Sequence, residues 1–299
     1  MRNKGGKTIE GVKLGRKLFY DPRLSKNNTI SCSSCHLSFN GFTHTDHALS
    51  HGINDSIGHR NSPVLINLAW GKSFMWDGGV NRLDVQALAP ITHPAEMGSD
   101  LNEVIAKLSK TEEYPRLFKR TYGNTEITGE KLLKAIAQFQ LTLVSADSKY
   151  DKMKAGDIEF TAQEQRGYRT FQTNCASCHA EPLFTNAGFA NNGLAIDTTL
   201  NDFGRMGITG NSYDSLLFKV PTLRNIEFSK PYMHDGRFRK LSEVLNHYNH
   251  EIIQSATLDE KLKKNILMSS NEKVDFIAFL LTLSDKEFLF NPDFSFPQN

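Results

Sequence analysis

The chain is short of three things: long apolar runs, an excess of either charge, and cysteine. No apolar run approaches the roughly 20 residues that a membrane-spanning helix needs. The 35 Lys and Arg against 33 Asp and Glu leave a net charge of +2, which gives no reason to expect nucleic acid or a membrane surface as a partner. No apolar segment follows the polar start, so we expect no signal peptide within this sequence. The length of 299 residues, 39% of them hydrophobic and 23% charged, suits a globular protein of two domains.

The four cysteines all belong to one motif that occurs twice, which leaves none for a disulfide. Residues 32–36 and 175–179 both read Cys-x-x-Cys-His, the attachment signature of c-type haem. The two thiols form thioethers with the haem, and the histidine ligates its iron from below. A zinc site would use the cysteines but would not explain the histidine that follows each pair. The motif therefore predicts two covalent haems, the first on Cys32, Cys35 and His36 and the second on Cys175, Cys178 and His179.

A weak internal repeat accompanies the two motifs. Gly-x-x-x-Phe precedes each one, at residues 15–19 and 167–171, and Phe-Thr follows each one, at 42–43 and 184–185. Such self-similarity indicates two related haem-binding units. Because residues 149–157 are polar and turn-like, we place the domain boundary there and predict an N-terminal haem domain over 1–155 and a C-terminal haem domain over 156–299.

The rest of the chain predicts a mainly α fold with long haem-wrapping loops. Asp100 and Glu103 indicate a helix that runs to about residue 108, and a capping box at Thr161 and Glu164 opens the helix before the second motif. Residues 37–98 and 186–235 are rich in Gly, Asn, Pro and Asp and lack periodicity, so we expect loops that wrap the haems. Period-2 strands are scarce, and the expected fold is two cytochrome c-like domains.

Three further helices are predicted from apolar spacing and caps. The first is a helix of roughly four turns with one apolar stripe, which begins at about residue 132. The second is capped by Ser242, and Ser269 and Glu272 open the last one. Their inward residues are expected to be Leu132, Ile136, Phe139 and Leu143 for the first, Leu241, Leu245 and Tyr248 for the second, and Val274, Ile277, Ala278 and Leu281 for the third.

A haem that performs chemistry needs an open face and a group that manages protons beside it. Glu96 is one candidate, because a carboxyl group in an apolar setting has a raised pKa. Trp76, one of two tryptophans, could relay electrons, although a packed core aromatic is the more ordinary role. Histidines in the loop after the first motif could ligate iron, although most loop histidines are solvated.

Several separated motifs in the right order resemble the bacterial di-haem cytochrome c peroxidases and their relatives in the MauG group. The similarity runs from Leu14 to Tyr248, which is most of the chain. Its landmarks are LGRKLFYDPRLS at 14–25, RNSP at 60–63, WDG at 76–78, EM at 96–97, VPTLRN at 220–225 and PYMHDG at 231–236.

The resemblance implies a role for each matching residue. His36 is expected to be the proximal ligand of the peroxide-reacting haem and His179 that of the electron-transfer haem. Glu96 matches the distal acid/base, Gln86 a neighbouring polar residue of the distal pocket, and Trp76 the aromatic residue between the haems. The resemblance also implies a calcium ion at the domain interface, held by Asn61, Ser229 and Pro231, whose oxygen donors suit that hard cation.

Two axial ligands are also implied by the resemblance. His51 matches the loop histidine that caps the peroxidatic iron in the resting state, with His44 and His47 as alternatives. The second haem usually has a distal methionine, but the matching position here is Tyr248, as in the MauG group. A phenolate ligand favours ferric iron and lowers the reduction potential. If Tyr248 is only a core aromatic, Met233 or Met268 takes its place as ligand.

The leading hypothesis is a periplasmic peroxidase that reduces hydrogen peroxide with electrons from a small c-type cytochrome or a cupredoxin. The alternatives are a MauG-like oxidase acting on a protein or organic substrate, and a non-enzymatic di-haem electron carrier. Tyr248 favours the oxidase, whereas Thr173 opposes it, because the MauG group has a tryptophan at that position. A homodimer is possible on this sequence. We expect the protein in the periplasm, because the family attaches its haems outside the cytoplasm.

Overall fold

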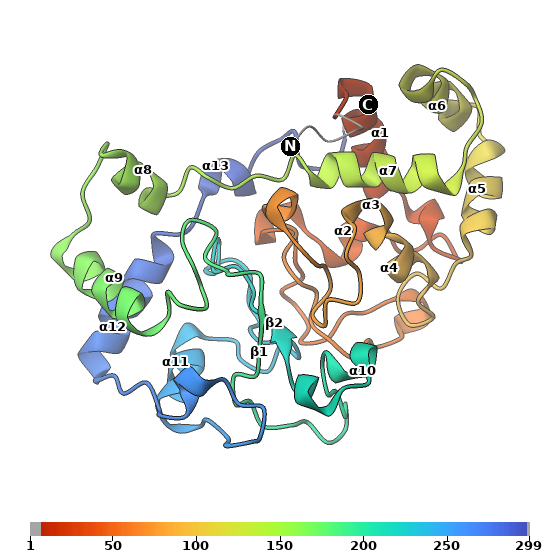
Figure 1. Cartoon of the computed structure of the whole chain (residues 1–299). Coiled ribbons are helices and arrows are strands. Elements are labelled where there is room, and N and C mark those ends of the chain that lie inside the picture. The colour runs from red at the N-terminus through yellow and green to blue at the C-terminus, as the bar shows by residue number, and fades with distance from the viewer. Residues whose placement is uncertain (1–6, 298–299) are drawn as a thin grey trace.

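The computed structural model describes residues 7–297, and most of its regular structure is helical (Figure 1). The one paired sheet in this range consists of β1 (Phe189–Ala190) and β2 (Phe218–Lys219), which are antiparallel with Phe189 opposite Lys219. No helix within the range is both long and apolar enough to cross a membrane. The helices are α1 (Ile9–Phe19), α2 (Cys32–Cys35), α3 (Leu83–Gln86), α4 (Leu88–Thr92), α5 (Leu101–Ser109), α6 (Glu113–Tyr122), α7 (Gly129–Gln140), α8 (Lys149–Ala155), α9 (Ala162–Asn174), α10 (Met206–Thr209), α11 (Leu241–His250), α12 (Ser270–Leu281) and α13 (Lys286–Leu289).

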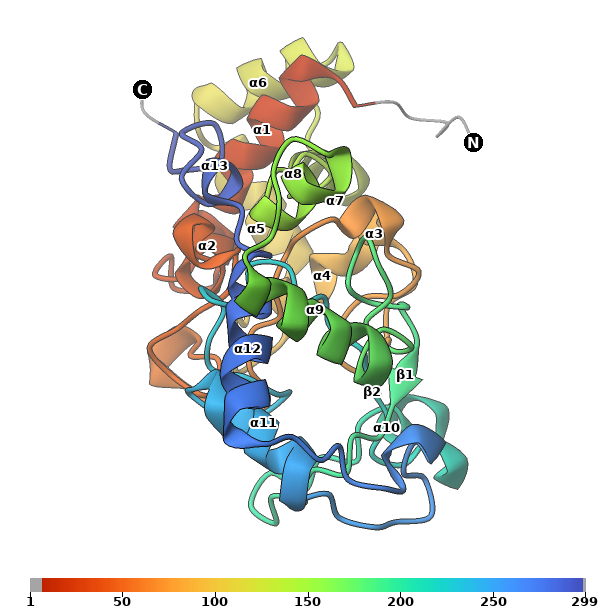
Figure 2. The ribbon, with the colours of Figure 1, turned by 90° about the vertical axis from the view of Figure 1, so that its left-hand side faces the viewer.

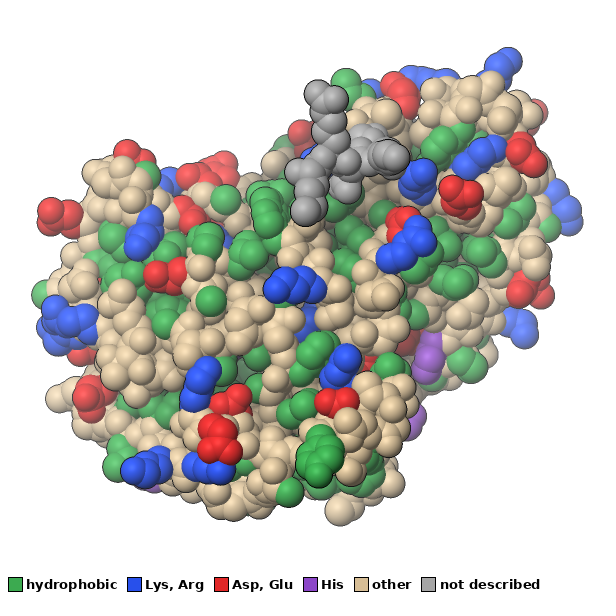
Figure 3. All heavy atoms as spheres, in the orientation of Figure 1, with side chains coloured by type: hydrophobic (Ala, Val, Ile, Leu, Met, Phe, Trp, Pro, Cys, Tyr) green, Lys and Arg blue, Asp and Glu red, His purple; other side chains and the backbone are tan. Residues whose placement is uncertain are grey.

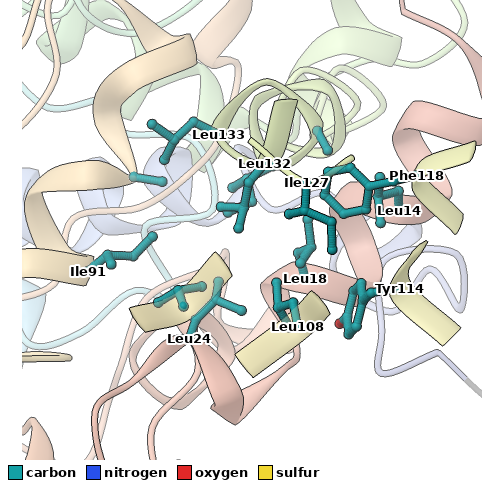
Figure 4. Close-up of a cluster of buried hydrophobic side chains, with 14 of the residues drawn as sticks. Leu14, Leu18, Leu24, Ile91, Leu108, Tyr114, Phe118, Ile127, Leu132 and Leu133 are labelled. Atoms are coloured by element: carbon teal, nitrogen blue, oxygen red, sulfur yellow. The ribbon is translucent and has the colours of Figure 1, made fainter. Parts of the chain in front are cut away.

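Helices α1 and α7 cross in close contact and carry the first hydrophobic cluster. Thr8 caps α1 and Thr128 caps α7, each through a side-chain oxygen that accepts a backbone N–H of the first turn. A Cβ built on Gly15 would lie 1.9 Å from the carbonyl oxygen of Ala135, so only glycine allows the two backbones to approach this closely. Figure 4 shows the cluster that forms around this crossing, in which Leu14, Leu18 and Leu132 are almost fully buried.

Helices α9 and α12 repeat this arrangement, and Figure 2 shows them side by side. Capping boxes at Thr161/Glu164 and Ser269/Glu272 start the two helices, as predicted. A Cβ on Gly167 would lie 2.0 Å from the carbonyl oxygen of Asp275. The two crossings therefore confirm that the Gly-x-x-x-Phe repeat has the same structural use in both halves of the chain.

The C-terminal segment returns to the first half of the chain. Phe288 and Leu289 of α13 pack with Phe19 and Phe42 in a cluster of their own. Arg16 adds a hydrogen bond from its guanidinium to the carbonyl oxygen of Pro292 at 2.6 Å. Residues 286–296 thus cover the first half of the chain, although the predicted boundary assigned them to the second domain. The boundary itself remains a prediction.

Several local predictions were wrong. Residues 149–155 form helix α8, not a turn, because Ser148 and Asp151 make a capping box there. Ser242 is not a cap, since α11 begins at Leu241 with Lys240 before it, and Glu243 accepts the N–H groups of residues 239 and 240. Helix α12 is not the last helix, because α13 follows it.

The expected inward faces were wrong in part. In α12, Val274 and Leu281 are 56% and 41% exposed, because the crossing at Gly167 turns another face inward. The buried residues of α12 are Asp275, Phe276, Phe279 and Leu280. Helix α7 ends at Gln140, so the predicted stripe residue Leu143 is buried but lies beyond the helix. Helix α5 begins and ends within one residue of its prediction.

Candidate haem sites

The first motif forms the short helix α2, with His36 directly after it. The Nδ1 atom of His36 lies 2.7 Å from the carbonyl oxygen of Phe42. A carbonyl oxygen only accepts, so Nδ1 carries the proton and Nε2 keeps its lone pair for a metal. Burial lowers the pKa of His36 to about 4, which keeps the ring neutral at pH 7. This is the state that an iron-ligating histidine needs.

The second motif has the same local design. Nδ1 of His179 lies 3.2 Å from the carbonyl oxygen of Phe184 and 3.1 Å from that of Pro221, and burial lowers the pKa of the imidazole. Phe42 and Phe184 are both fully buried and both have positive φ, 59° and 54°. The Phe-Thr element of the sequence repeat therefore supplies the carbonyl oxygen that orients each histidine.

One cavity, about 290 Å³ in volume, joins the second motif to residues from the first half of the chain. Cys175, Cys178 and His179 line it together with Tyr248 of α11. Trp76 and the three predicted calcium ligands, Asn61, Ser229 and Pro231, line the same cavity. Met233 also lines it, whereas the other alternative ligand, Met268, belongs to the buried hydrophobic cluster that includes Phe171 and Phe279.

Tyr248 is half-buried, and burial raises the pKa of its phenol to about 12, with a hydrogen bond from Asn192 acting in the opposite direction. The phenol therefore stays protonated at neutral pH unless a cation in the cavity stabilises the phenolate. The same Asn192 amide donates to the sulfur of Met233 at 3.4 Å. Asn192 thus contacts two of the three candidate axial ligands, Tyr248 and Met233.

Glu96 lies beside the first motif, not in the cavity of the second. The backbone of Gly52 packs against that of Glu96, and the Glu96 carbonyl oxygen accepts the N–H of Ile53 at 2.8 Å. The carboxyl group is about one-third exposed; burial raises its pKa, and His93, 3.8 Å away, opposes the rise. Burial and then the charge of Glu96 raise the pKa of the Cys35 thiol to about 11.

The three candidate loop histidines form one stack. The ring centroids of His44 and His47 are 5.1 Å apart, and those of His47 and His51 are 4.1 Å apart. The carbonyl oxygen of His51 accepts a hydrogen bond from the Cys35 thiol at 3.5 Å, so the stack borders the first motif. Which of the three caps an iron stays a prediction.

Trp76 is held at the junction of the two halves. Its indole Nε1 donates to the carbonyl oxygen of Asn61 at 2.8 Å, and its own carbonyl oxygen accepts the N–H of Lys219 at 2.7 Å. The side-chain amide of Asn61 donates a hydrogen bond to the carbonyl oxygen of Ala48, so the side-chain oxygen of Asn61 points away from Ala48. Within residues 7–297 there is no cluster of three His, Cys, Asp or Glu side chains able to hold a metal, so a calcium ion would depend on amide, hydroxyl and carbonyl oxygens.

Residues 9–159 match the sequence family described as di-haem cytochrome c peroxidase. This chain belongs to the di-haem cytochrome c peroxidase family. A MauG protein of Methylorubrum extorquens is 36% identical over 288 residues, which cover 92% of this chain and 78% of the relative. A cytochrome c551 peroxidase of Nitrosomonas europaea is 37% identical over 298 residues, which cover 96% and 82%.

Solved structures agree with this assignment. A MauG-like protein associated with microbial copper homeostasis superposes with a TM-score of 0.89 at 31% identity, covering 99% of this chain and 95% of that one. The di-haem peroxidase BthA of Burkholderia thailandensis, at 20% identity and a TM-score of 0.85, shows the shared fold. As a family member, this di-haem peroxidase is a haem-dependent oxidoreductase acting on peroxide, and the family implies two c-type haems.

The residues of the peroxidase fit those haems. All four cysteines are free thiols, both motif histidines present Nε2, and the cavity gathers the second motif with a facing phenol. When bound, the haems supply the redox-active iron.

One repeated element of the peroxidase was missed by sequence reasoning. Met75 and Met233 both have positive φ, and each sulfur accepts a hydrogen bond from a carboxamide, Gln86 at 3.5 Å and Asn192 at 3.4 Å. The signal was present as Met-x-Asp-Gly at residues 75–78 and 233–236. By this correspondence, Asn192 is the counterpart of Gln86 in the second half.

Proposed function

We propose that this protein reduces hydrogen peroxide to water at the haem held by His36, with two electrons and two protons consumed for each peroxide. The observation that supports this most is Glu96, a partly buried carboxyl group of raised pKa, whose backbone packs against Gly52, next in the chain to the His51 carbonyl oxygen that accepts from Cys35. A carboxyl group of raised pKa can take a proton from the near oxygen of peroxide and return it to the far oxygen at neutral pH. Gln86 would position the peroxide by hydrogen bonding, and His51 would supply the imidazole that holds the iron at rest.

Cys175, Cys178 and His179 would hold the second haem, with Tyr248 as its distal ligand, and this haem would accept the electrons of the donor. Trp76, which the hydrogen bond to Asn61 holds in place, would lie on the route to the first haem. A small c-type cytochrome or a cupredoxin is the donor, and the periplasm is the compartment in which donor and enzyme meet. The two haem domains divide near residue 155.

A calcium ion held by Asn61, Ser229 and Pro231 fixes the junction beside Trp76. The support is that all three residues line the same cavity as Trp76. Removing calcium with a chelator should lower the thermal midpoint, and adding calcium back should restore it. An unchanged midpoint at saturating chelator would contradict the calcium site.

The test of the peroxidase activity is the Glu96→Gln variant, assayed with peroxide and a reduced c-type cytochrome. Losing a general acid–base group lowers the rate by about 10²–10⁴-fold. Both haems should remain attached, as measured by the Soret absorbance per protein. Glu103→Gln, an exposed glutamate on α5, is the matched control and should keep full activity. Unaltered turnover in Glu96→Gln would defeat the assignment.

A MauG-like oxidase is the second candidate, and Tyr248 in the second haem cavity favours it. The identity of the electron donor distinguishes the two functions. Rapid peroxide consumption with reduced cytochrome supports the peroxidase. Peroxide consumption that needs an added protein or organic substrate, with no oxidation of cytochrome, supports the oxidase.

A further inference from the structure

Lys219 lies in the wall of the second haem cavity, and within residues 7–297 its amino group has no acidic partner of its own. The side chain lines the cavity together with His179 and Tyr248. Its Nζ donates to the carbonyl oxygen of Ser73 at 3.4 Å, which is long for such a bond. The carboxylate of Asp77 attracts the charge of Lys219, but it is already paired with the Arg60 guanidinium at 2.5 Å.

Burial lowers the pKa of Lys219 to about 8, and Asp77 opposes this shift only in part. A partly buried ammonium group whose charge is only partly balanced costs free energy. That cost is removed if the cavity holds an anion within reach of Nζ. Haem carries two propionate carboxylates, and they lie on the edge of the ring away from the vinyl groups that the cysteines take.

The position of Lys219 suits the carboxylate edge. Lys261, a second lysine that lines the cavity, lies at the thioether edge, with its Nζ 4.0 Å from the Cys178 sulfur. Lys219 is instead bound to the loop from the first half of the chain, through Ser73 and the carbonyl oxygen of Trp76. Strand β2 fixes its backbone by pairing with Phe189.

We propose that Lys219 binds a propionate carboxylate of the second haem, at the wall of the cavity shared with Trp76. The inference rests on the proposed function in one respect, that the second haem occupies this cavity and accepts electrons. An ammonium group at the propionate offsets its negative charge, so it raises the reduction potential of this haem and favours electron entry. Lys219 is thus a positioning residue that acts through the haem.

The test compares Lys219→Met with Lys219→Arg in the holoprotein. The midpoint potential of each haem is measured by spectroelectrochemistry, and the propionate bending band by resonance Raman spectroscopy. In Lys219→Met we expect a lower potential for the second haem and a shifted propionate band. Lys219→Arg keeps the charge and should stay close to the wild-type values. If Lys219→Met does not yield holoprotein, Lys219→Gln removes the charge with less change of shape, and the same shifts are expected.

An unchanged second-haem potential and propionate band would overturn the proposal, as would shifts confined to the first haem. Lys261→Met removes the lysine at the thioether edge, and a larger shift there than in Lys219→Met would also overturn it. These measurements use no peroxide. Their failure is therefore distinguishable from a failure of the peroxidase assignment, which the turnover of Glu96→Gln decides.

Discussion

The Cα of Gly167 lies against the backbone of Asp275, so closely that a Cβ on the glycine would be 2.0 Å from the Asp275 carbonyl oxygen. This contact sets the crossing of α9 and α12, and it buries Phe171 and Phe279 completely. The same crossing directs the helix that leads into the second haem motif. A side chain at this position has to push the two helices apart.

We therefore expect Gly167→Ala to lower the free energy of unfolding by about 1–3 kcal/mol, the usual cost of overpacking. Chemical denaturation of the holoprotein measures it. Gly207→Ala, on α10 with no atom within 4 Å of the added Cβ, is the control and should be neutral. Equal stability of the two variants would show that the backbones can separate without cost.

Replacing Tyr248 should change the axial ligation of the second haem. Tyr248→Phe keeps the aromatic packing and removes the phenol, so we expect the phenolate-to-iron vibrations to disappear from the resonance Raman spectrum. Met233→Leu is the matched variant, because Met233 lines the same cavity and shares the amide of Asn192. A changed ligand spectrum in Met233→Leu, together with an unchanged one in Tyr248→Phe, would assign the position to the methionine.

Trp76→Phe should slow electron transfer between the haems, because it removes the indole held at the junction. The lost hydrogen bond to the Asn61 carbonyl oxygen should also cost about 1 kcal/mol of stability. Flash-induced reduction followed at each haem band measures the transfer rate. Trp70→Phe is the control, since Trp70 lines the same cavity but is 54% exposed. Equal rates in the two variants would remove Trp76 from the route.

Arg60 should stabilise the junction of the two halves in a pH-dependent way. It pairs with Asp77 at 2.5 Å and with Asp202 at 2.6 Å. Burial alone would raise the pKa of Asp202, but the hydrogen bonds from Arg60 hold it below its ordinary value. We expect Arg60→Gln to cost about 2 kcal/mol at neutral pH, less than for a fully buried pair because a quarter of the Arg60 side chain is exposed.

The sign of the pH effect follows from the lowered pKa of Asp202. The folded protein binds this proton less readily than the unfolded chain, so the stabilisation is present above the ordinary carboxyl pKa of about 3.9 and disappears as the pH falls through the lowered value. Thermal midpoints of wild type and Arg60→Gln should therefore converge below about pH 4. A gap that stays constant down to pH 3 would contradict this. Arg82→Gln breaks an exposed pair with Asp84 and should leave the midpoint unchanged.

Sequence reasoning was reliable where a few neighbouring residues carry the signal. The capping boxes at Thr161 and Ser269 and the helix after Asp100 begin where predicted, because a cap depends on residues three apart. It failed for the inward face of α12, because the close crossing with α9, which is distant in the sequence, determines which face is buried. It also missed Asn192, whose neighbours in the sequence give no hint of its contact with Met233.

By itself, the sequence determined that the chain carries two c-type haem motifs and belongs with the di-haem peroxidases. Five consecutive residues are enough to attach a haem, so this information is local. Only the tertiary structure decided that Asn61, Trp76 and Lys219 share one cavity with His179 and Tyr248. The physical reason is that the close helix crossings at Gly15 and Gly167 and the ion pairs of Arg60 bring distant segments together, and such contacts cannot be read from the spacing of residues along the chain.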